Sequence, residues 1–216
     1  MAETLGFQDC IRMLTAAAEQ IRAKHEMLSE LDSHGGDGDH GVTMVRAMNQ
    51  IEKGIANVPE QEIKALFKSV GWAIMGVDGG ATGPLLGSLF MGMAEGTEER
   101  ETLDARALVS VFESGLKSVR KYSKAQVSDK TIMDARVPAV EAARVAAENG
   151  GDVTDVLRMA AEAAERGAKS TTALQARFGR AKNIGERSIG VQDAGATSMW
   201  LLFKGFSEGV DSNAGQ

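Results

Sequence analysis

The stretch FQDCIRMLTAAAEQIRAKHEML, residues 7–28, sets a pattern that recurs along the whole chain. Its apolar side chains are spaced in steps of three and four residues, which places them on one face of a helix. These positions are Phe7, Ile11, Leu14, Ala18, Ile21 and Leu28, with His25 filling the gap. The stretch therefore predicts an amphipathic helix whose apolar face packs against other elements.

Seven further segments carry the same spacing and predict seven more helices. Their approximate ranges are 44–55, 63–74, 84–93, 102–119, 131–149, 152–164 and 195–206. No segment alternates apolar and polar residues as a half-buried strand does. We therefore expect an all-α bundle of eight helices joined by short turns, forming a single domain over residues 1–216.

Polar residues before these segments indicate where several helices begin. Thr102 is the expected N-cap of the fifth helix, and the sixth opens near Thr131. Either Asp152 or Thr154 caps the seventh. Pro138 is expected to bend the sixth helix or to lie in its first turns, because proline removes a backbone donor.

The composition excludes several classes of protein. The chain has a formal net charge of −6 and a pI near 5.2, so a nucleic acid is not an expected partner, because nucleic-acid binding needs a basic surface. A single cysteine, Cys10, excludes a disulfide scaffold and a cysteine-based metal site. The 25 glycines stand beside only 3 prolines and show no fixed period, so we expect them in particular loops.

No segment signals export or membrane insertion. The N-terminus lacks an apolar core of signal-peptide length. The longest uncharged stretch, residues 79–94, is shorter than the roughly 20 apolar residues that a membrane span needs, and glycines and Pro84 interrupt it. We therefore expect a cytoplasmic protein with no membrane association.

Four connections are longer and richer in glycine than a helical bundle requires, namely residues 31–41, 77–84, 123–134 and 177–198. In an up-and-down bundle, alternate connections lie at the same end. The loops after the first, third, fifth and seventh helices should therefore gather on one rim. These are the four connections just named.

The first of these loops, LDSHGGDGDHG, places Asp32, Asp37 and Asp39 within eight positions. Carboxylates so close repel one another unless a cation lies between them, and oxygen ligands favour hard cations such as Mg²⁺. The loop therefore indicates a magnesium site. The alternative is that Asp37 or Asp39 only caps the next helix while the glycines form turns.

Two other loops carry groups that suit phosphate. Residues 79–83, GGATG, place small residues and free backbone N–H groups at a helix N-terminus, where backbone binds phosphate. The fourth loop adds the cations Arg177, Arg180, Lys182 and Arg187. The first feature is equally compatible with a tight turn, and the second with a solvated surface.

Taken in order, the segments LDSHGGDGDHG, GGATGPLLG, SDKTIMDARVPA and GRAKNIGERSIGVQDAGATS resemble the diagnostic segments of the L subunit family of dihydroxyacetone kinase. The resemblance covers essentially the whole chain. It implies an antiparallel up-and-down barrel of eight helices with a nucleotide and metal site in the loops at one rim. It also implies that Asp32, Asp37 and Asp39 bind two Mg²⁺ ions that clamp the phosphates of ADP or ATP.

The resemblance further implies a set of nucleotide-binding residues. Two groups would lie against the phosphates, a third would line the adenine and ribose pocket, and a fourth would close the site. In this order they are His40, Gly41 and Thr43; Gly80, Ala81 and Thr82; Ser123 and Ile132; and Arg180 with Asp193, Ala194 and Gly195.

The same family implies a division of labour. A separate K-type subunit holds a ketose covalently, and the L subunit delivers a phosphoryl group to the terminal hydroxyl of that ketose. This chain is then a phosphotransferase subunit that is inactive alone and needs no nucleophilic side chain, since phosphoryl transfer depends mainly on positioning and charge neutralisation. In one branch of the family a phosphotransferase-system protein rephosphorylates a bound ADP, which would make that protein a second partner.

The chain departs from the family pattern at several rim positions. Thr43 stands where Asn is usual, Thr82 where Ser is usual, and residues 182–194 differ at several places. These positions would meet adenine or the partner, so the handling of the nucleotide and the ketose (dihydroxyacetone or a four-carbon ketose such as erythrulose) stay open. The phosphoryl source, consumed ATP or a bound ADP that is rephosphorylated, also stays open. A rival hypothesis from another class is a non-catalytic helical module that binds a partner protein or a lipid.

Overall fold

A computed structural model describes residues 3–211 of the chain. These residues form helices and contain no strand, only an isolated bridge between Leu5 and Leu103, so the all-α prediction is confirmed. The described helices are α1 (Phe7–Ala23), α2 (His25–Ser33), α3 (His40–Ala56), α4 (Ile63–Met75), α5 (Thr82–Gly96), α6 (Ala105–Tyr122), α7 (Ile132–Glu148), α8 (Val153–Ser170) and α9 (Ala194–Asp211), with short 3₁₀ helices η1 (Thr171–Ala173) and η2 (Arg180–Ser188).

The first predicted helix is two helices in the structure. The backbone leaves helical geometry at Lys24, where φ is −122° and ψ is 13°, and α2 follows at once. The apolar spacing continues across this break, so periodicity did not reveal it. Because α2 runs to Ser33, Asp32 lies in a helical turn and not in the predicted loop.

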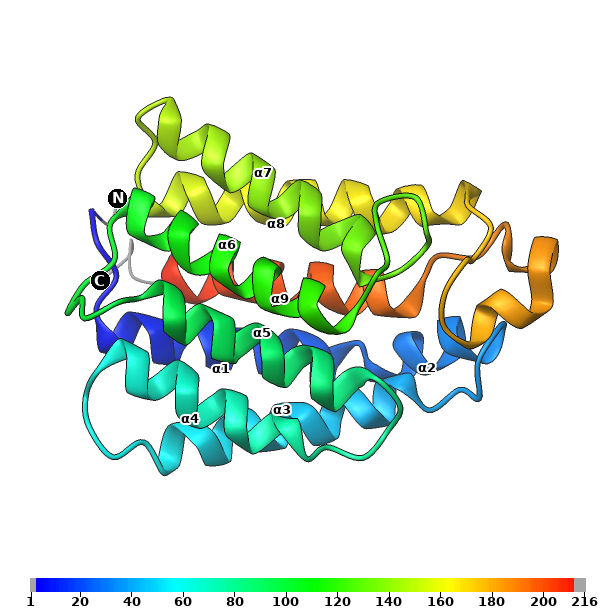
Figure 1. Ribbon diagram of the computed structural model, residues 1–216, viewed down its shortest axis with the longest axis horizontal. Coiled ribbons are helices and arrows are strands. Elements are labelled where there is room, and N and C mark those ends of the chain that lie inside the picture. Colours follow the sequence, from blue (N-terminus) through cyan, green and yellow to red (C-terminus); the bar gives the residue numbers. More distant parts are fainter. Residues whose placement is uncertain (1–2, 212–216) are drawn as a thin grey trace.

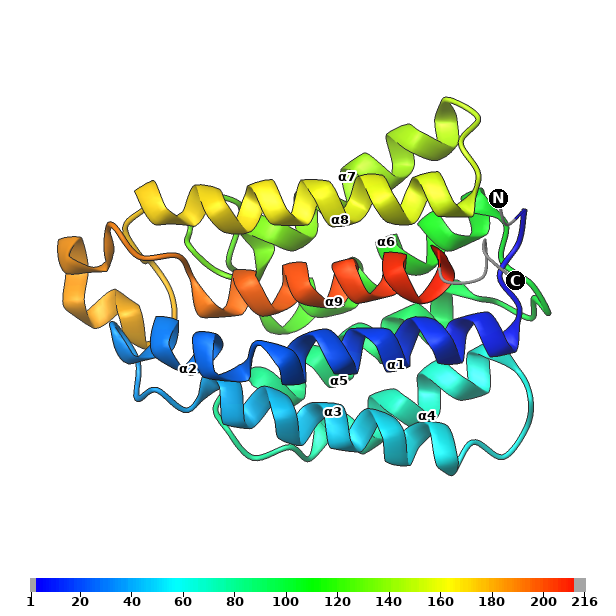
Figure 2. The ribbon, with the colours of Figure 1, turned by 180° about the vertical axis from the view of Figure 1, so that it is seen from behind.

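The helices pack in a closed sequence of contacts. Each helix from α3 to α9 contacts the next, and α1 contacts both α3 and α9 (Figures 1 and 2). Neighbouring helices run antiparallel: Gly71 of α4 lies against Met91 of α5, and Gly87 lies against Met75. The short helix α2 and η2 lie at one end of the bundle, whereas α1 begins and α9 ends at the other (Figure 1).

Helix starts agree with the sequence at two places and differ at one. Thr131 caps α7 and Asp152 caps α8 through side-chain acceptors. The cap of α6 is Asp104, whose carboxylate accepts from Ala107 N–H at 2.8 Å, and not Thr102 as predicted. The reason is that Leu103 still forms the extended bridge to Leu5, so the helix can begin only after it.

The expectation that the glycines lie in particular loops holds for only some of them. Many glycines lie inside helices where two backbones cross closely. A Cβ on Gly167 of α8 would lie 2.0 Å from the Asp134 carbonyl oxygen of α7, and a Cβ on Gly205 of α9 would lie 2.3 Å from Ala17 Cα of α1. Glycine therefore sets the close packing between these helix pairs.

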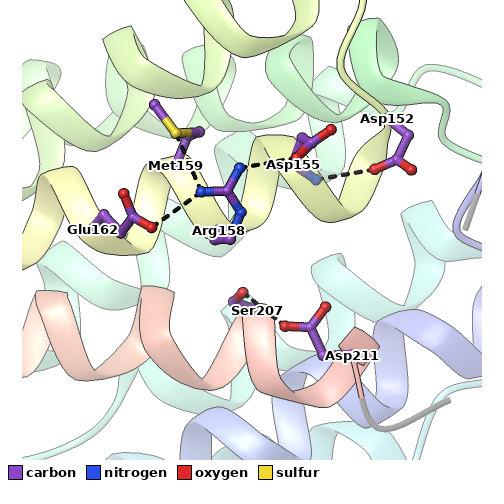
Figure 3. A network of polar contacts seen from close by, with 7 residues as sticks. All are labelled: Asp152, Asp155, Arg158, Met159, Glu162, Ser207 and Asp211. Carbon is purple, nitrogen blue, oxygen red and sulfur yellow. Dashed lines mark hydrogen bonds and ion pairs between the residues drawn. The ribbon is translucent and has the colours of Figure 1, made fainter. Parts of the chain in front are cut away.

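The outer face of α8 shows how exposed helix surfaces are built (Figure 3). Arg158 donates to Asp155 at 2.9 Å and to Glu162 at 3.1 Å, while Asp152 accepts from the Asp155 N–H at 3.0 Å. Exposed ion pairs of this kind add little stability. None of the helices in residues 3–211 is long and apolar enough to cross a membrane.

Arg136 is a charged side chain buried in the core with no ion pair among the described residues. Arg136 of α7 is 1% exposed, and its guanidinium contacts only the Phe112 carbonyl at 3.4 Å and the Met199 sulfur at 3.8 Å. Its Nε has no hydrogen-bond partner. Burial lowers the pKa of Arg136 to about 9. This side chain therefore opposes folding at neutral pH, because its charge loses hydration without gaining a carboxylate.

We predict that Arg136→Met increases the free energy of unfolding by about 1–3 kcal/mol, because an apolar side chain of similar length removes the buried charge. Urea denaturation followed by circular dichroism measures this change. The matched control is Arg144→Met on the same helix, where an exposed ion pair with Glu148 is lost and a change within about 0.5 kcal/mol is expected. A loss of stability in Arg136→Met would show that the guanidinium is a net stabiliser.

Candidate functional site

A cavity of about 410 Å³ opens among all four long connections. Its wall includes parts of residues 31–44, 79–86, 122–132 and 178–199. Segments that are far apart in sequence thus meet around one space. Of the residues that the resemblance implied, those lining it are Asp32, Asp37, Asp39, His40, Gly80, Ala81, Thr82, Ser123, Ile132, Arg180, Asp193, Ala194 and Gly195.

Three carboxylates gather on one side of this cavity. One oxygen from each of Asp32, Asp37 and Asp39 lies within 4.8 Å of the others. Asp39 occupies the N-cap position of α3, yet its side chain makes no capping hydrogen bond. Arg180 forms an ion pair with Asp37. Capping therefore does not account for Asp39, and the cluster offers a cation several oxygen ligands.

The glycines of the first loop allow this arrangement. A Cβ on Gly36 would lie 2.3 Å from a carboxylate oxygen of Asp32, and a Cβ on Gly35 would lie 2.8 Å from Ala181 Cβ. The loop therefore packs directly on the Asp32 side chain and on η2. Any larger residue would push one of these neighbours away.

The N-terminus of α5 faces the same cavity. Gly79 and Gly80 have φ values of +137° and +61°, and Ala81 precedes the first residue of α5, Thr82. No other residue lies within 4 Å of a Cβ placed on Gly80, so the backbone is open there. The Thr82 N–H donates to the Gly79 carbonyl at 3.4 Å, while the N–H groups of Gly80 and Ala81 and the positive end of the helix dipole make this turn suitable for an anion.

Two residues of the implied set do not line the cavity. Gly41 packs against the backbone of α2, since a Cβ there would lie 1.9 Å from the His25 carbonyl oxygen. Thr43 is 1% exposed and lies behind Gly79, and its hydroxyl has no hydrogen-bond partner. These residues support the wall and do not face the space.

His40 connects the first loop to α9. Its Nε2 lies 3.0 Å from Ser198 Oγ, and the Ser198 hydroxyl donates to the Gly195 carbonyl at 2.9 Å. Burial lowers the pKa of His40, and the nearby Asp32 carboxylate opposes this shift. The ring is therefore neutral at pH 7 and has a single N–H, for which Ser198 Oγ and the Ala194 backbone carbonyl are the two acceptors.

Asp193 lies at the start of α9, where its Oδ1 accepts from the Ala196 N–H at 2.7 Å. Burial raises the pKa of its carboxyl group to about 6, an effect that this hydrogen bond and the Lys130 ammonium oppose. Lys130 also lines the cavity, and sequence reasoning missed it. Its only signal was its place inside SDKTIMDARVPA.

The rest of the cavity wall is largely apolar. Sequence reasoning named Ser123 and Ile132 here and missed the hydrophobic residues around them, because an apolar residue in a helix or a loop gives no sign by itself of facing a ligand. The missed apolar and aromatic lining residues are Leu31, Met44, Leu85, Leu86, Tyr122, Phe178, Ile184 and Met199. A flat apolar group fits beside a polar one in this space.

Fold and site together define an all-helical domain that presents a carboxylate cluster and a glycine-rich helix start in one cavity, an arrangement suited to a hard cation and a phosphate. The model of the DAK2 domain family matches residues 34–208, and the chain belongs to this family. The resemblance inferred from the four segments is thereby confirmed.

Several curated relatives match almost the full chain. It is 36% identical to the PEP-dependent dihydroxyacetone kinase ADP-binding subunit DhaL of Escherichia coli, covering 93% of this chain and 96% of that one. It is 35% identical to the subunit DhaL of PEP-dependent dihydroxyacetone kinase 1 of Listeria innocua, covering 89% and 91%.

A solved structure shares the fold. The crystal structure of the dihydroxyacetone kinase from C. freundii in complex with AMP-PNP and Mg²⁺ aligns with a TM-score of 0.70 at 25% sequence identity. The alignment covers 91% of this chain and 33% of that one. The present chain thus corresponds to about a third of the longer kinase.

We predict that Asp193 makes folding depend on pH. Its raised pKa means that the folded state holds the proton longer than the unfolded state, so stability falls as pH rises from about 4 to about 7. Asp193→Asn keeps a capping oxygen but cannot ionise. The unfolding free energy of wild type minus that of Asp193→Asn should therefore fall by about 2 kcal/mol across this range. Urea denaturation at pH 4, 5, 6 and 7 measures it, and a constant difference would contradict it.

Proposed function

We propose that this chain is the ADP- or ATP-binding subunit of a dihydroxyacetone kinase. In this role it delivers a phosphoryl group to the terminal hydroxyl of a small ketose that a separate K-type subunit holds covalently. The observation that carries the proposal is the carboxylate cluster and the α5 N-terminus in one cavity. The printed names of the E. coli and Listeria relatives support it.

The three aspartates fit the proposed metal. Asp32, Asp37 and Asp39 supply only oxygen ligands, and Mg²⁺ prefers a few carboxylates together with phosphate and water. We assign two Mg²⁺ ions to this cluster. Bound magnesium would neutralise phosphate charge, which is most of what phosphoryl transfer requires. Arg180, already paired with Asp37, is placed to contribute positive charge on the same side.

The remaining cavity residues have separate tasks in this proposal. The backbone N–H groups of Gly80 and Ala81 and the Thr82 hydroxyl donate to phosphate oxygens, and the His40 side chain lies against the phosphates. Ser123, Ile132 and the apolar wall hold the adenosine, and the turn of Asp193, Ala194 and Gly195 closes the site. Gly41 and Thr43 act from behind, by allowing α3 to pack against α2 and the Gly79 turn.

Several wider assignments rest on the same family membership. The closed helix contacts correspond to the family's antiparallel eight-helix barrel, with α2 as an extension of α1, and a single domain spans residues 1–216. The chain works in the cytoplasm and requires the K-type subunit for activity. A phosphotransferase-system protein is the proposed phosphoryl donor if the nucleotide stays bound between turnovers.

The first experiment denatures freshly purified protein and identifies any released nucleotide, then titrates ATP and Mg²⁺ into stripped protein. Retained ADP would assign the chain to the branch that uses ADP as a cofactor. Reversible binding of Mg-ATP to an empty site would assign it to the ATP-consuming branch. Binding of neither would contradict the proposal and favour a non-catalytic module. Dihydroxyacetone and erythrulose are then compared as acceptors with the K-type subunit added.

We predict that Asp37→Ala weakens Mg²⁺-dependent ADP binding at least about 100-fold, equivalent to about 2.7 kcal/mol, while the helical circular dichroism is unchanged. Loss of a half-exposed loop carboxylate scarcely affects packing. Calorimetry with and without Mg²⁺ measures the affinity. The control is Asp78→Ala, an exposed carboxylate next to the α5 turn, which should bind normally. Equal binding by both variants would contradict the metal assignment.

A further inference from the structure

Lys130 is an unusual residue in the third long connection. It is 4% exposed, and its backbone lies in the left-handed region with φ of +61°. That conformation costs a residue other than glycine about 1 kcal/mol. Its ammonium donates to two backbone carbonyls, Thr171 at 2.7 Å and Val191 at 2.5 Å. Lys130 thus combines two unfavourable features, a strained backbone and a buried charge, with two hydrogen bonds to residues that are distant in sequence.

These two carbonyls lie close to the two ends of one segment. We call residues 174–193, between η1 and α9, the strap; it is orange in Figures 1 and 2 and lies at the same end as α2. Thr171 lies just before the strap, and Val191 lies near its end. One ammonium therefore ties the place where the strap leaves the bundle to the place where it returns.

The strap brings several residues to the cavity. Phe178, Arg180, Ile184 and Asp193 all line it, and Arg180 pairs with Asp37. Beyond Lys130, the strap is joined to its surroundings by the Arg177–Asp129 and Arg180–Asp37 ion pairs and by hydrogen bonds from backbone N–H groups. The Arg177 N–H donates to the Asp129 carbonyl at 3.1 Å, the Gly190 N–H to Thr172 at 2.8 Å, and the Asp193 N–H to the Thr171 hydroxyl at 2.9 Å.

The 123–131 loop is itself built to present Lys130. The Asp134 carboxylate accepts from the Ser128 N–H at 2.6 Å and from the Thr131 N–H at 2.7 Å, on both sides of Lys130. The Asp129 carboxylate accepts from the Gln126 N–H at 2.8 Å. These bonds fix the loop, so the ammonium has a defined position from which charge-assisted hydrogen bonds reach the strap.

We propose that Lys130 is a positioning residue that holds the strap over the cavity and thereby keeps Arg180 and Asp193 in place to bind nucleotide. Lys130 acts through the Thr171 and Val191 carbonyls and needs no contact with the ligand. The part of this inference that concerns nucleotide rests on the proposed function. The part that concerns the strap does not.

The test compares wild type with Lys130→Met, which keeps the length of the side chain and removes its three donors. Hydrogen–deuterium exchange of the ligand-free proteins should show at least tenfold faster exchange of the strap amides, with α1, α5 and α8 unchanged. The dissociation constant of Mg-ADP, measured by calorimetry, should rise about tenfold. The control is Lys169→Met, which removes an exposed lysine near the end of α8 and should change neither quantity.

Three results would overturn the inference: unchanged exchange in the strap, a uniform rise over the whole chain, or a loosened strap with unchanged Mg-ADP affinity. If wild type binds no ADP, the proposed function fails, and strap exchange alone then decides the role of Lys130. Should Lys130→Met fail to fold, Lys130→Gln, which keeps an amide donor but shortens the side chain and removes its charge, takes its place and is held to the same outcomes.

Discussion

Antiparallel helix packing is the constraint on which the site depends. Because neighbouring helices run in opposite directions, every second connection returns to the same end (Figure 1). Residues remote in sequence can then meet directly: His40 lies within hydrogen-bond distance of Ser198, 158 positions later, and Lys130 bonds to Val191, 61 positions later. Close helix crossings at Gly167 and Gly205 hold the scaffold to which these loops are attached.

Electrostatics at that end are unbalanced without a ligand. Asp32, Asp37 and Asp39 carry three negative charges within a few ångströms, and the half-buried Asp193 adds a fourth at neutral pH. Arg180 and Lys130 are the arginine and the lysine that line this cavity in the part of the chain that the structure describes. Repulsion among the carboxylates therefore favours the uptake of cations, and a cation bound there in turn favours an anionic ligand on the α5 turn.

Much of the fold could be predicted from the sequence, because the spacing of the apolar residues that become buried marks each long helix. The three-and-four spacing located every long helix, and the side chains of Thr131 and Asp152 marked two starts correctly. The break at Lys24 was not visible, since apolar spacing runs through it. The choice of Asp104 over Thr102 depended on a bridge between Leu5 and Leu103, nearly a hundred residues apart. Long-range backbone pairing of this kind leaves no local signature.

The candidate site, like the fold, could be predicted from the sequence only in part. Asp32, Asp37 and Asp39 stand out in sequence because carboxylates and glycines crowd one loop, and the structure brings them together. Lys130 does not stand out, because its role depends on carbonyls 41 and 61 positions away. Gly41 and Thr43 lie in the same motif as the aspartates but behind the wall, since helical geometry turns successive residues to different sides.

Several energetically unfavourable features of the structure lie at the cavity and indicate that it is the functional site. Left-handed backbone at Lys130, clustered carboxylates and an Asp193 with a raised pKa all occur at residues that line one cavity. Glu98 also has positive φ, but it is exposed in a turn away from the cavity. Strain and charge that packing does not require persist where a ligand compensates them. Arg136 is the contrasting case: it carries a comparable cost inside the core, so its removal should stabilise the fold, whereas relief of the costs around the cavity should weaken binding.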